Sequence, residues 1–253
     1  RHLVLNSIRN YRIKHKDKYG EIVICTDCHG SWRKQVFPQY KAHRKIKREK
    51  QKTEDGMDWS ALFKTINDII IEIDTHFPYK VIAVPHAEGD DVIAILAKNI
   101  QEKSIIISSD KDFSQLHKYK HIKQYSPIQK KMLSTSNPYK YLQEHIIRGD
   151  KGDGVPNILS ADDCIVKGER QKPITKKKLA VWMEQSDMAN GLSVNWKRNQ
   201  QLIDFEYIPE NISKGIMDSY AKKKDDNKQG QLLNYFITNR LKYLMENIED
   251  FIR

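Results

Sequence analysis

The chain has few cysteines and no long apolar segment. Its 253 residues include three cysteines, Cys25, Cys28 and Cys164, so a disulfide framework is excluded and the reducing cytoplasm is the expected compartment. No apolar run approaches the roughly 20 residues of a membrane-spanning helix, and no secretory signal opens the chain. We therefore expect no membrane partner. Internal repeats are also absent, and the length allows one large or two modest domains.

Two of the cysteines form the segment Cys25-Thr-Asp-Cys28. A CxxC segment is compatible with half of a zinc site or with a redox pair. Because no second CxxC completes a zinc site, we interpret the two residues as buried thiols that flank Asp27.

The chain has an excess of positive charge, with 44 Lys and Arg against 33 Asp and Glu, for a net charge of +11. This excess favours a polyanionic partner. The most basic part is Trp32–Lys52, with nine basic residues and one acidic residue, interleaved with Phe37, Pro38 and Tyr40. We expect a mobile, poorly ordered basic arch at about residues 30–56, whose side chains contact a nucleic-acid backbone while Tyr40 stacks on a base. The alternative is a solvated surface segment. The predicted contacts are Arg33, Lys34, Tyr40, Lys41, Arg44 and Lys45.

Acidic residues follow three short apolar segments that have the composition of buried strands. Ile105–Ile107 leads to Asp110 and Asp112, Glu21–Ile24 leads to Asp27, and Val81–Val84 leads to an acidic Glu-Gly-Asp-Asp segment. A single strand followed by acidic residues is explained equally well by capping of the next helix. Three of them predict a ligand site, because ligands bind at the carboxyl ends of parallel strands.

A fourth acidic segment, Gly149–Asn157, places Asp150 and Asp153 among three glycines, where backbone amides can approach a phosphate. We expect nucleic-acid contacts from Lys151, Gly152 and Gly154. Collecting so many carboxylates requires cations, and oxygen ligands favour two Mg²⁺ ions about 4 Å apart, with Mn²⁺ able to substitute. Together with the basic arch, this pattern predicts a metal-dependent nuclease. The candidate metal ligands are Asp27, Glu88, Asp90, Asp91, Asp110, Asp112, Asp150 and Asp153.

The apolar pattern predicts an α/β fold with a mostly parallel central sheet flanked by helices, followed by a helical C-terminal domain. We expect an edge hairpin of His121–Tyr125 with Lys131–Leu133, and a helix that starts at Asn137-Pro138. The expected domains are residues 1–135 and 136–253. Further helices are expected at Ile174–Ala189, Val194–Phe205 and Leu232–Phe251.

These residues resemble the 5′-nuclease family of flap endonucleases and polymerase 5′-exonuclease domains, and within it the branch of T-even bacteriophage ribonuclease H enzymes. The resemblance covers the whole chain. The matching motifs, in family order, are Y-K-x-x-R at Tyr40–Arg44, E-G-D-D at Glu88–Asp91, S-S-D-K-D-F at Ser108–Phe113, G-D-K-G-D at Gly149–Asp153 and, for the phage branch, L-I-D-F-E-Y-I-P at Leu202–Pro209.

The resemblance implies structure-specific 5′-to-3′ hydrolysis of DNA and of RNA primers, in the cytoplasm of a bacterial host. It implies that Lys41 and Arg44 bind the scissile phosphate and that Asp27 and Asp110 belong to the catalytic group. A helix-turn-helix element near the fourth acidic segment is implied to hold duplex DNA. A monomer is expected, with a single-stranded-DNA-binding protein or a sliding clamp as protein partner.

The family's first strand, with its first metal-ligating aspartate, has no counterpart here, and we expect it upstream of Arg1. The later glycines of the family's helix-turn-helix segment are also missing from the stretch after Asp153. A non-catalytic DNA-binding fragment is therefore an alternative. A second is a haloacid-dehalogenase-type phosphatase, which Asp110-Lys-Asp112 imitates, although that chemistry requires Thr or Val shortly after the second aspartate, where this chain has Phe113 and Ser114.

Overall fold

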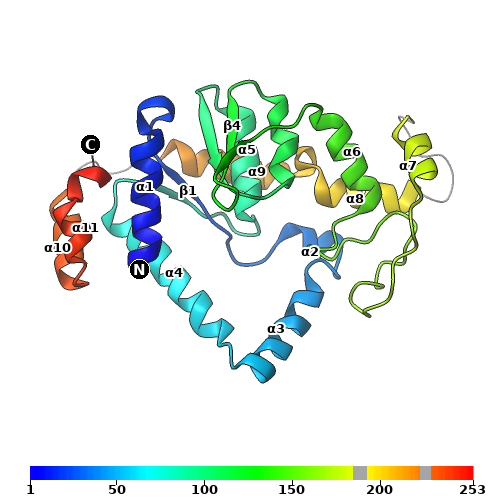
Figure 1. The fold of residues 1–253 in the computed structure, drawn as a ribbon, viewed down its shortest axis with the longest axis horizontal. Coiled ribbons are helices and arrows are strands. Elements are labelled where there is room, and N and C mark those ends of the chain that lie inside the picture. The colour runs from blue at the N-terminus through cyan, green and yellow to red at the C-terminus, as the bar shows by residue number, and fades with distance from the viewer. Residues whose placement is uncertain (185–192, 223–228, 253) are drawn as a thin grey trace.

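The computed structural model describes residues 1–184, 193–222 and 229–252. The N-terminal half alternates strands with helices, and the C-terminal half is helical (Figure 1). In chain order the first elements are α1 (His2–Tyr19), β1 (Val23–Cys25), α2 (Trp32–Val36), α3 (Ala42–Asp55), α4 (Trp59–His76), β2 (Lys80–Ile82), α5 (Gly89–Asn99), β3 (Ser104–Ile107), the 3-10 helix η1 (Asp112–Lys118), β4 (Ile122–Ser126) and β5 (Lys131–Leu133). They are followed by α6 (Pro138–Arg148), α7 (Lys176–Met183), α8 (Ser193–Ile203), η2 (Phe205–Tyr207), α9 (Glu210–Ala221), α10 (Gln229–Thr238), α11 (Lys242–Glu246) and η3 (Ile248–Phe251).

The strands form two small sheets in the part of the chain that the structure describes. β1 pairs in parallel with β2, and β3 pairs in parallel with β4. β4 and β5 form the expected antiparallel hairpin, with Tyr125 opposite Met132. The prediction of parallel strands is confirmed. Within the described residues the strands fall into a two-stranded and a three-stranded group, with no hydrogen-bonded ladder between the groups.

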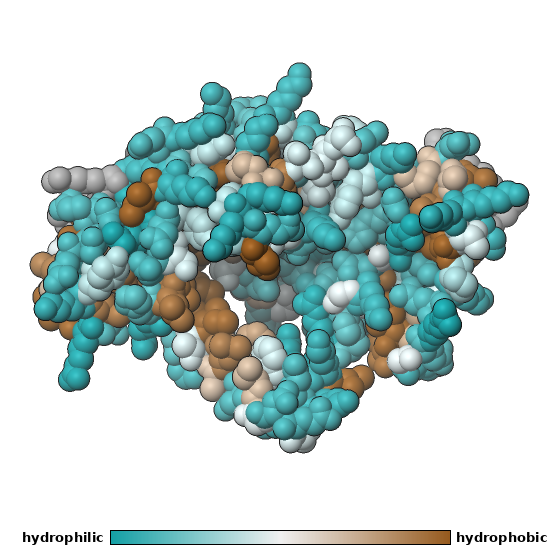
Figure 2. All heavy atoms as spheres, viewed as in Figure 1, coloured by the Kyte–Doolittle hydropathy of each residue, from teal (hydrophilic) through white to brown (hydrophobic). Residues whose placement is uncertain are grey.

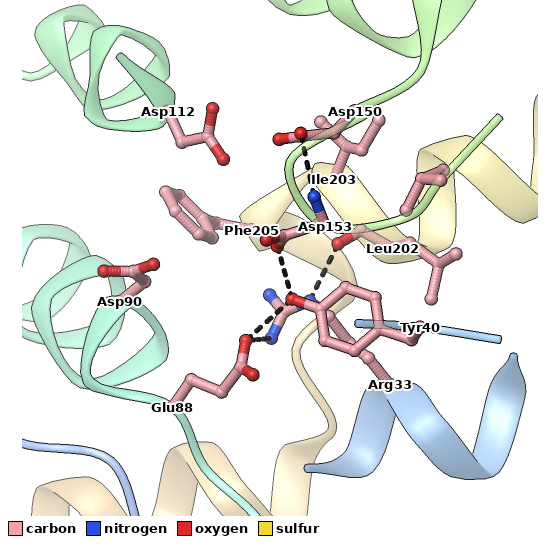
Figure 3. A pocket seen from close by; sticks show the side chains of 11 residues that line it. Arg33, Tyr40, Glu88, Asp90, Asp112, Asp150, Asp153, Leu202, Ile203 and Phe205 are labelled. Atoms are coloured by element: carbon pink, nitrogen blue, oxygen red, sulfur yellow. Dashed lines mark hydrogen bonds and ion pairs between the residues drawn. The ribbon is translucent and has the colours of Figure 1, made fainter. Parts of the chain in front are cut away.

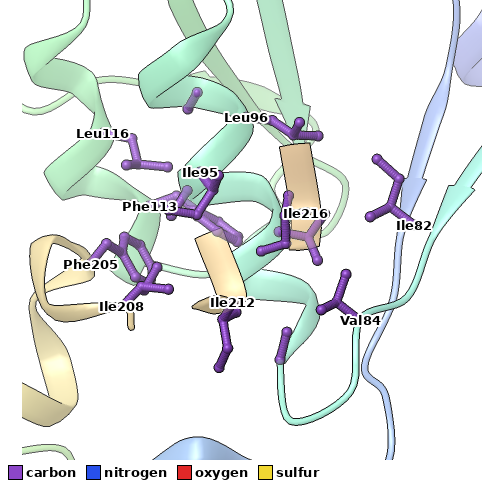
Figure 4. Close-up of a cluster of buried hydrophobic side chains, with 14 of the residues drawn as sticks. Ile82, Val84, Ile95, Leu96, Phe113, Leu116, Phe205, Ile208, Ile212 and Ile216 are labelled. Carbon is purple, nitrogen blue, oxygen red and sulfur yellow. The ribbon is translucent and has the colours of Figure 1, made fainter. Parts of the chain in front are cut away.

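Helix α5 lies at the centre of the larger core. The four consecutive residues Ala94–Ala97 are all buried, so the helix is buried around most of its circumference rather than along one stripe. Helix α9 packs across it through Ile212 and Ile216 (Figure 4). The N-terminus of α5 is therefore held in a fixed place, and this terminus carries the Glu-Gly-Asp-Asp segment.

Helices α3 and α4 project from the body as a V (Figure 1), and an opening separates them from the rest of the molecule (Figure 2). No residue of α3 is buried, and α4 buries only Ile69 and Ile73 near its end. Asp58 caps α4 by accepting a hydrogen bond from the Ala61 amide at 3.0 Å. The basic arch is thus helical rather than poorly ordered, and only the second half of α4 packs against the body.

The C-terminal half begins as the sequence predicts. Asn137 accepts a hydrogen bond from the Lys140 amide at 2.9 Å, with Pro138 in the first turn of α6. The helix that follows α6 in the chain, α7, starts only at Lys176, after a long connection of turns. The predicted helix Ile174–Ala189 extends into residues 185–192, which lie outside the described residues. Among the helices that are described, none is long and apolar enough to cross a membrane.

Candidate active site

Five of the eight predicted carboxylates line one pocket, together with Arg33 and Tyr40 (Figure 3). Three separate segments deliver them. The start of α5 supplies two, the exit of β3 into η1 supplies one, and the turn after α6 supplies two. The five carboxylates are those of Glu88, Asp90, Asp112, Asp150 and Asp153.

Two further aspartates lie beside this pocket. Asp27 follows β1 and accepts a hydrogen bond from the Gly89 amide at 2.7 Å, which ties the end of β1 to the start of α5. Asp110 follows β3, and its carboxylate accepts the Asp112 amide at 2.9 Å. Both side chains are exposed, so they border the pocket from the solvent side.

The eighth carboxylate, Asp91, points into the protein interior. It is fully buried, and it accepts hydrogen bonds from Trp32 Nε1 and Arg33 Nη1, both at 3.1 Å. A second Arg33 nitrogen lies 2.8 Å from the other Asp91 oxygen. The structure therefore contradicts two expectations, because Asp91 and the buried Arg33 form an internal ion pair and neither is free to bind a metal or a nucleic acid.

Crowding of acids raises two pKa values in the pocket. Burial and the neighbouring carboxylate of Asp110 raise the pKa of Asp90 to about 7. Burial also raises the pKa of Asp112 to about 7, against the opposing effect of His145. Without a cation, these two groups cannot easily ionise together with their neighbours, and this is the electrostatic condition that divalent metals relieve.

His145 is a site residue that sequence reasoning missed. It lies on α6, with Nδ1 3.5 Å from Asp112 and Nε2 3.5 Å from Asp150. Asp112, His145 and Asp150 place ligand atoms within 4.8 Å of one another. Burial opposes protonation of His145, but the two carboxylates outweigh it, and its pKa lies above the ordinary value. The only signal in the sequence is that His145 stands one helical turn before Gly149, where α6 ends and the acidic turn begins.

The acidic turn after α6 is shaped by its glycines. Gly149 has a φ of 67°, and a Cβ there would lie 2.4 Å from the carbonyl oxygens of Val155 and Pro156. Asp150 accepts the Asp153 amide at 3.1 Å. Burial opposes ionisation of Asp150, but His145 and the backbone amides hold its pKa below the ordinary value. This turn therefore presents two fixed carboxylates to the pocket.

The base of the basic arch is docked on these carboxylates. Lys41 Nζ lies 2.8 Å from Glu88 and 3.6 Å from Asp153, and an Arg44 nitrogen lies 2.6 Å from Asp153. The Tyr40 hydroxyl lies 2.8 Å from Glu88 and 2.6 Å from Asp153, and it can donate its one proton to either. Burial raises the Tyr40 pKa, so this hydroxyl is protonated. The Tyr40 ring is 2% exposed, so the expectation that it offers a face to a base is not met in this conformation.

The remaining predicted nucleic-acid contacts divide into two groups. Lys34, Lys45, Lys151 and Gly152 are exposed. Gly154 is buried. Residues of the arch pack closely on it, and a Cβ there would lie 2.9 Å from His43 Nδ1 and 3.2 Å from the Gln39 carbonyl oxygen. Gly154 therefore allows the arch to approach the acidic turn, and it does not face a phosphate here.

The chemistry of the pocket suits divalent cations. Carboxylate oxygens dominate it, burial and neighbouring acids raise the pKa values of two of the carboxyls, and Lys41 and Arg44 lie between the carboxylates. Such a set fits hard oxygen-binding ions. The Cys25 thiol, whose pKa burial raises to about 12, contributes no ligand to the pocket.

Two family descriptions match this chain. "5′-3′ exonuclease, N-terminal resolvase-like domain" matches residues 2–145, and "T4 RNase H, C terminal" matches residues 136–251. Ribonuclease H of Enterobacteria phage T4 is 34% identical over 99% of this chain and 86% of its own length. Flap endonuclease Xni of Shewanella pealeana is 36% identical over 51% of this chain and 49% of its own.

Solved structures share the fold at low identity. A phage T5 protein co-crystallised with metal ions superposes with a TM-score of 0.61 at 17% identity, covering 86% of this chain and 92% of that one. The phage T5 flap endonuclease in a complex with DNA and metal ions gives 0.60 at 17% identity, covering 85% and 88%. These matches exclude the phosphatase alternative. The chain belongs to the 5′-3′ exonuclease family, and it is a structure-specific 5′-to-3′ nuclease.

Proposed function

We propose that the chain uses two Mg²⁺ ions to hydrolyse phosphodiester bonds at DNA 5′ ends and flaps and in the RNA strand of RNA–DNA hybrids. This reaction would remove RNA primers during phage DNA replication. The observation that carries the proposal is that five carboxylates meet Lys41 and Arg44 at one pocket. The names of the relatives, a ribonuclease H and a flap endonuclease, support both substrates. The DNA complex of the phage T5 enzyme supports DNA as the ligand.

The carboxylates divide into two neighbouring groups. We assign the first ion to the segments after β1 and β3 and at the start of α5, with some ligands acting through water. The second ion is assigned to Asp112 and the acidic turn. Divalent cations held by these residues would supply an activated water and would neutralise charge on the leaving oxygen. The ligand groups are Asp27, Glu88, Asp90, Asp110 and Asp112 for the first ion, and Asp112, Asp150 and Asp153 for the second.

Residues of the arch would hold the substrate. Lys41 and Arg44 lie within the pocket's reach and can transfer from carboxylates to the scissile phosphate, which presents the same kind of anionic oxygen. Lys34 and Lys45 are exposed and extend this positive surface along a nucleic-acid backbone. Stacking by Tyr40 requires the arch to leave its docked position, because the ring is buried now.

The C-terminal half would hold the duplex. Lys151 and Gly152 are exposed on the acidic turn, where a phosphate can be approached by both a side chain and a backbone amide. We retain 1–135 as the nuclease domain and 136–253 as the duplex-binding domain. Asp150 and Asp153 then cross from the second domain into the first domain's site. A monomer, with a single-stranded-DNA-binding protein or sliding clamp as partner, stays a prediction.

The test is cleavage of a 5′-labelled flap and of a nicked RNA–DNA duplex at low salt, in Mg²⁺ and in EDTA. Short 5′ products are expected only with Mg²⁺. Asp110→Asn should abolish cleavage and leave DNA affinity within about twofold, because it removes a metal ligand and no phosphate contact. Asp68→Asn, at a surface carboxylate paired with Lys64, is the matched control. Cleavage in EDTA, or full cleavage by Asp110→Asn, would refute the proposal; binding without cleavage would indicate a DNA-binding module.

A further inference from the structure

The imidazole of His145 is held at the edge of the acidic pocket by its surroundings. Its side chain is 15% exposed, and the Tyr141 ring packs against it edge-on, with centroids 5.8 Å apart. Nδ1 is buried and has no hydrogen-bond partner among the described residues. The 3.5 Å separations from Asp112 and Asp150 are long for hydrogen bonds. The ring is therefore positioned between the two carboxylates, with a long Nε2 contact to Asp150 and an Nδ1 that makes no hydrogen bond to the described residues.

The three side chains are spaced slightly more widely than ligands around one ion. Bonds of about 2.1 Å in an octahedral site separate neighbouring ligand atoms by about 3 Å and opposite ones by about 4.2 Å. The ligand atoms of Asp112, His145 and Asp150 lie within 4.8 Å of one another. The Asp150 carboxylate is anchored independently, because it accepts a hydrogen bond from the Asp153 amide, and the Asp112 backbone is fixed by the bond from its amide to the Asp110 carboxylate. Small side-chain movements bring all three onto one cation.

We propose that His145 is a direct nitrogen ligand of the second divalent cation and makes that site prefer Mn²⁺ or Co²⁺ over Mg²⁺. The inference rests on the proposed two-metal function and changes its second site, for which the sequence predicts oxygen ligands alone. Nitrogen ligands raise the affinity for transition metals, while Mg²⁺ favours oxygen. His145 is thus the residue that sets metal specificity.

The first test measures metal affinity by calorimetry without nucleic acid, with Mn²⁺ and with Mg²⁺. His145→Gln should lower Mn²⁺ affinity at the second site at least about tenfold and Mg²⁺ affinity much less, and His145→Asp should favour Mg²⁺. His76→Gln is the matched control, because His76 also has a buried, unpartnered Nδ1 but stacks on Tyr235 away from the pocket. An unchanged Mn²⁺/Mg²⁺ ratio in His145→Gln overturns the inference, and so does tighter binding of both ions.

The second test detects the metal–nitrogen bond itself. Electron spin echo modulation of the Mn²⁺-loaded protein should contain imidazole nitrogen frequencies in the wild type and lose them in His145→Gln. Their absence from the wild type overturns the inference. Asp150→Asn distinguishes a failure of the nitrogen-ligand inference from a failure of the proposed two-metal function. If it weakens both metals while His145→Gln changes neither, the two-metal function stands and the nitrogen ligand does not; if the wild type binds no divalent ion, the proposed function itself fails.

Discussion

Two adjacent aspartates should respond oppositely to the same substitution. Asp91 is fully buried against Arg33, whereas Asp90 lines the acidic pocket. Asp91→Asn removes the charge that balances a buried guanidinium, and breaking a buried pair costs about 3–5 kcal/mol. The asparagine can still accept from Trp32, and Arg33 keeps the Leu202 carbonyl. We therefore expect the lower end, about 3 kcal/mol, or a melting temperature lower by roughly 6–12 °C.

Asp90→Asn should have no such cost. Because the pKa of Asp90 is raised to about 7, its ionised form destabilises the folded protein. This penalty is absent well below the ordinary pKa of 3.8, grows as the pH rises from there to about 7, and is complete at pH 8. The difference between the ordinary 3.8 and about 7 corresponds to at most about 4 kcal/mol. The Asn variant should therefore melt at the same or a higher temperature than the wild type in EDTA at pH 8.

The assay pairs thermal melts in EDTA at pH 8 with Mg²⁺ titration of the folded proteins. Asp91→Asn should melt early but bind Mg²⁺ with nearly wild-type affinity. Asp90→Asn should melt normally and bind Mg²⁺ weakly. If Asp91→Asn melts like the wild type and loses Mg²⁺, then Asp91 is a ligand and its assignment to an internal ion pair is refuted.

Three further predictions concern the supports of the site and of the core. Gln124→Leu removes a buried side-chain amide that donates hydrogen bonds to the carbonyl oxygens of Ser108 and Asp110, in the loop of the paired aspartates. We expect the free energy of unfolding to fall by about 2 kcal/mol and Mg²⁺ to bind more weakly, as measured by thermal melting and calorimetry. Unaltered Mg²⁺ affinity would contradict this prediction. Gly149→Ala should lower the urea midpoint of unfolding by more than Gly20→Ala does. Both glycines have positive φ, but only at Gly149 would the added Cβ lie 2.4 Å from backbone oxygens. Equal shifts would show that φ alone determines the loss of stability. Burial opposes ionisation of Glu206, but two lysines lower its pKa to about 2. Glu206→Gln should therefore lower the free energy of unfolding at pH 7 by about 1 kcal/mol, after allowance for the 39% exposure of the Glu206 side chain. This difference from the wild type should vanish as the pH falls from 4.5 to 2, and a pH-independent difference would exclude the ion pairs as its source.

Local signals account for what could be predicted from the sequence. The three isoleucines of β3 and the Asp110-Lys-Asp112 exit were recognisable because a buried strand has a short apolar run and an abrupt polar end. Asp58 and Asn137 cap helices as their residue types predict. These features depend on neighbours within a few residues, so they were accessible without a fold.

What the sequence could not predict depends on contacts between distant segments. Asp90 and Asp91 are equivalent in an acidic run, but on a helix they point about 100° apart. Only the arrival of Arg33 from α2, 58 positions away, decides which one turns inward. The burial of Tyr40 and the place of His145 likewise follow from the docking of the arch and the direction of α6. The parallel pairing of the strands was predictable, but the division of the strands into two separate hydrogen-bonded groups was not.

The docked arch supplies counterions to the acidic pocket from the protein itself. Lys41 pairs with Glu88, and Arg44 pairs with Asp153. An incoming divalent ion must therefore displace a side-chain cation, and each displaced cation becomes available to a phosphate. Metal and nucleic acid should consequently bind with positive thermodynamic linkage, each raising the affinity of the other by the same factor. We therefore expect divalent metal and nucleic acid to occupy the site together more readily than either does alone.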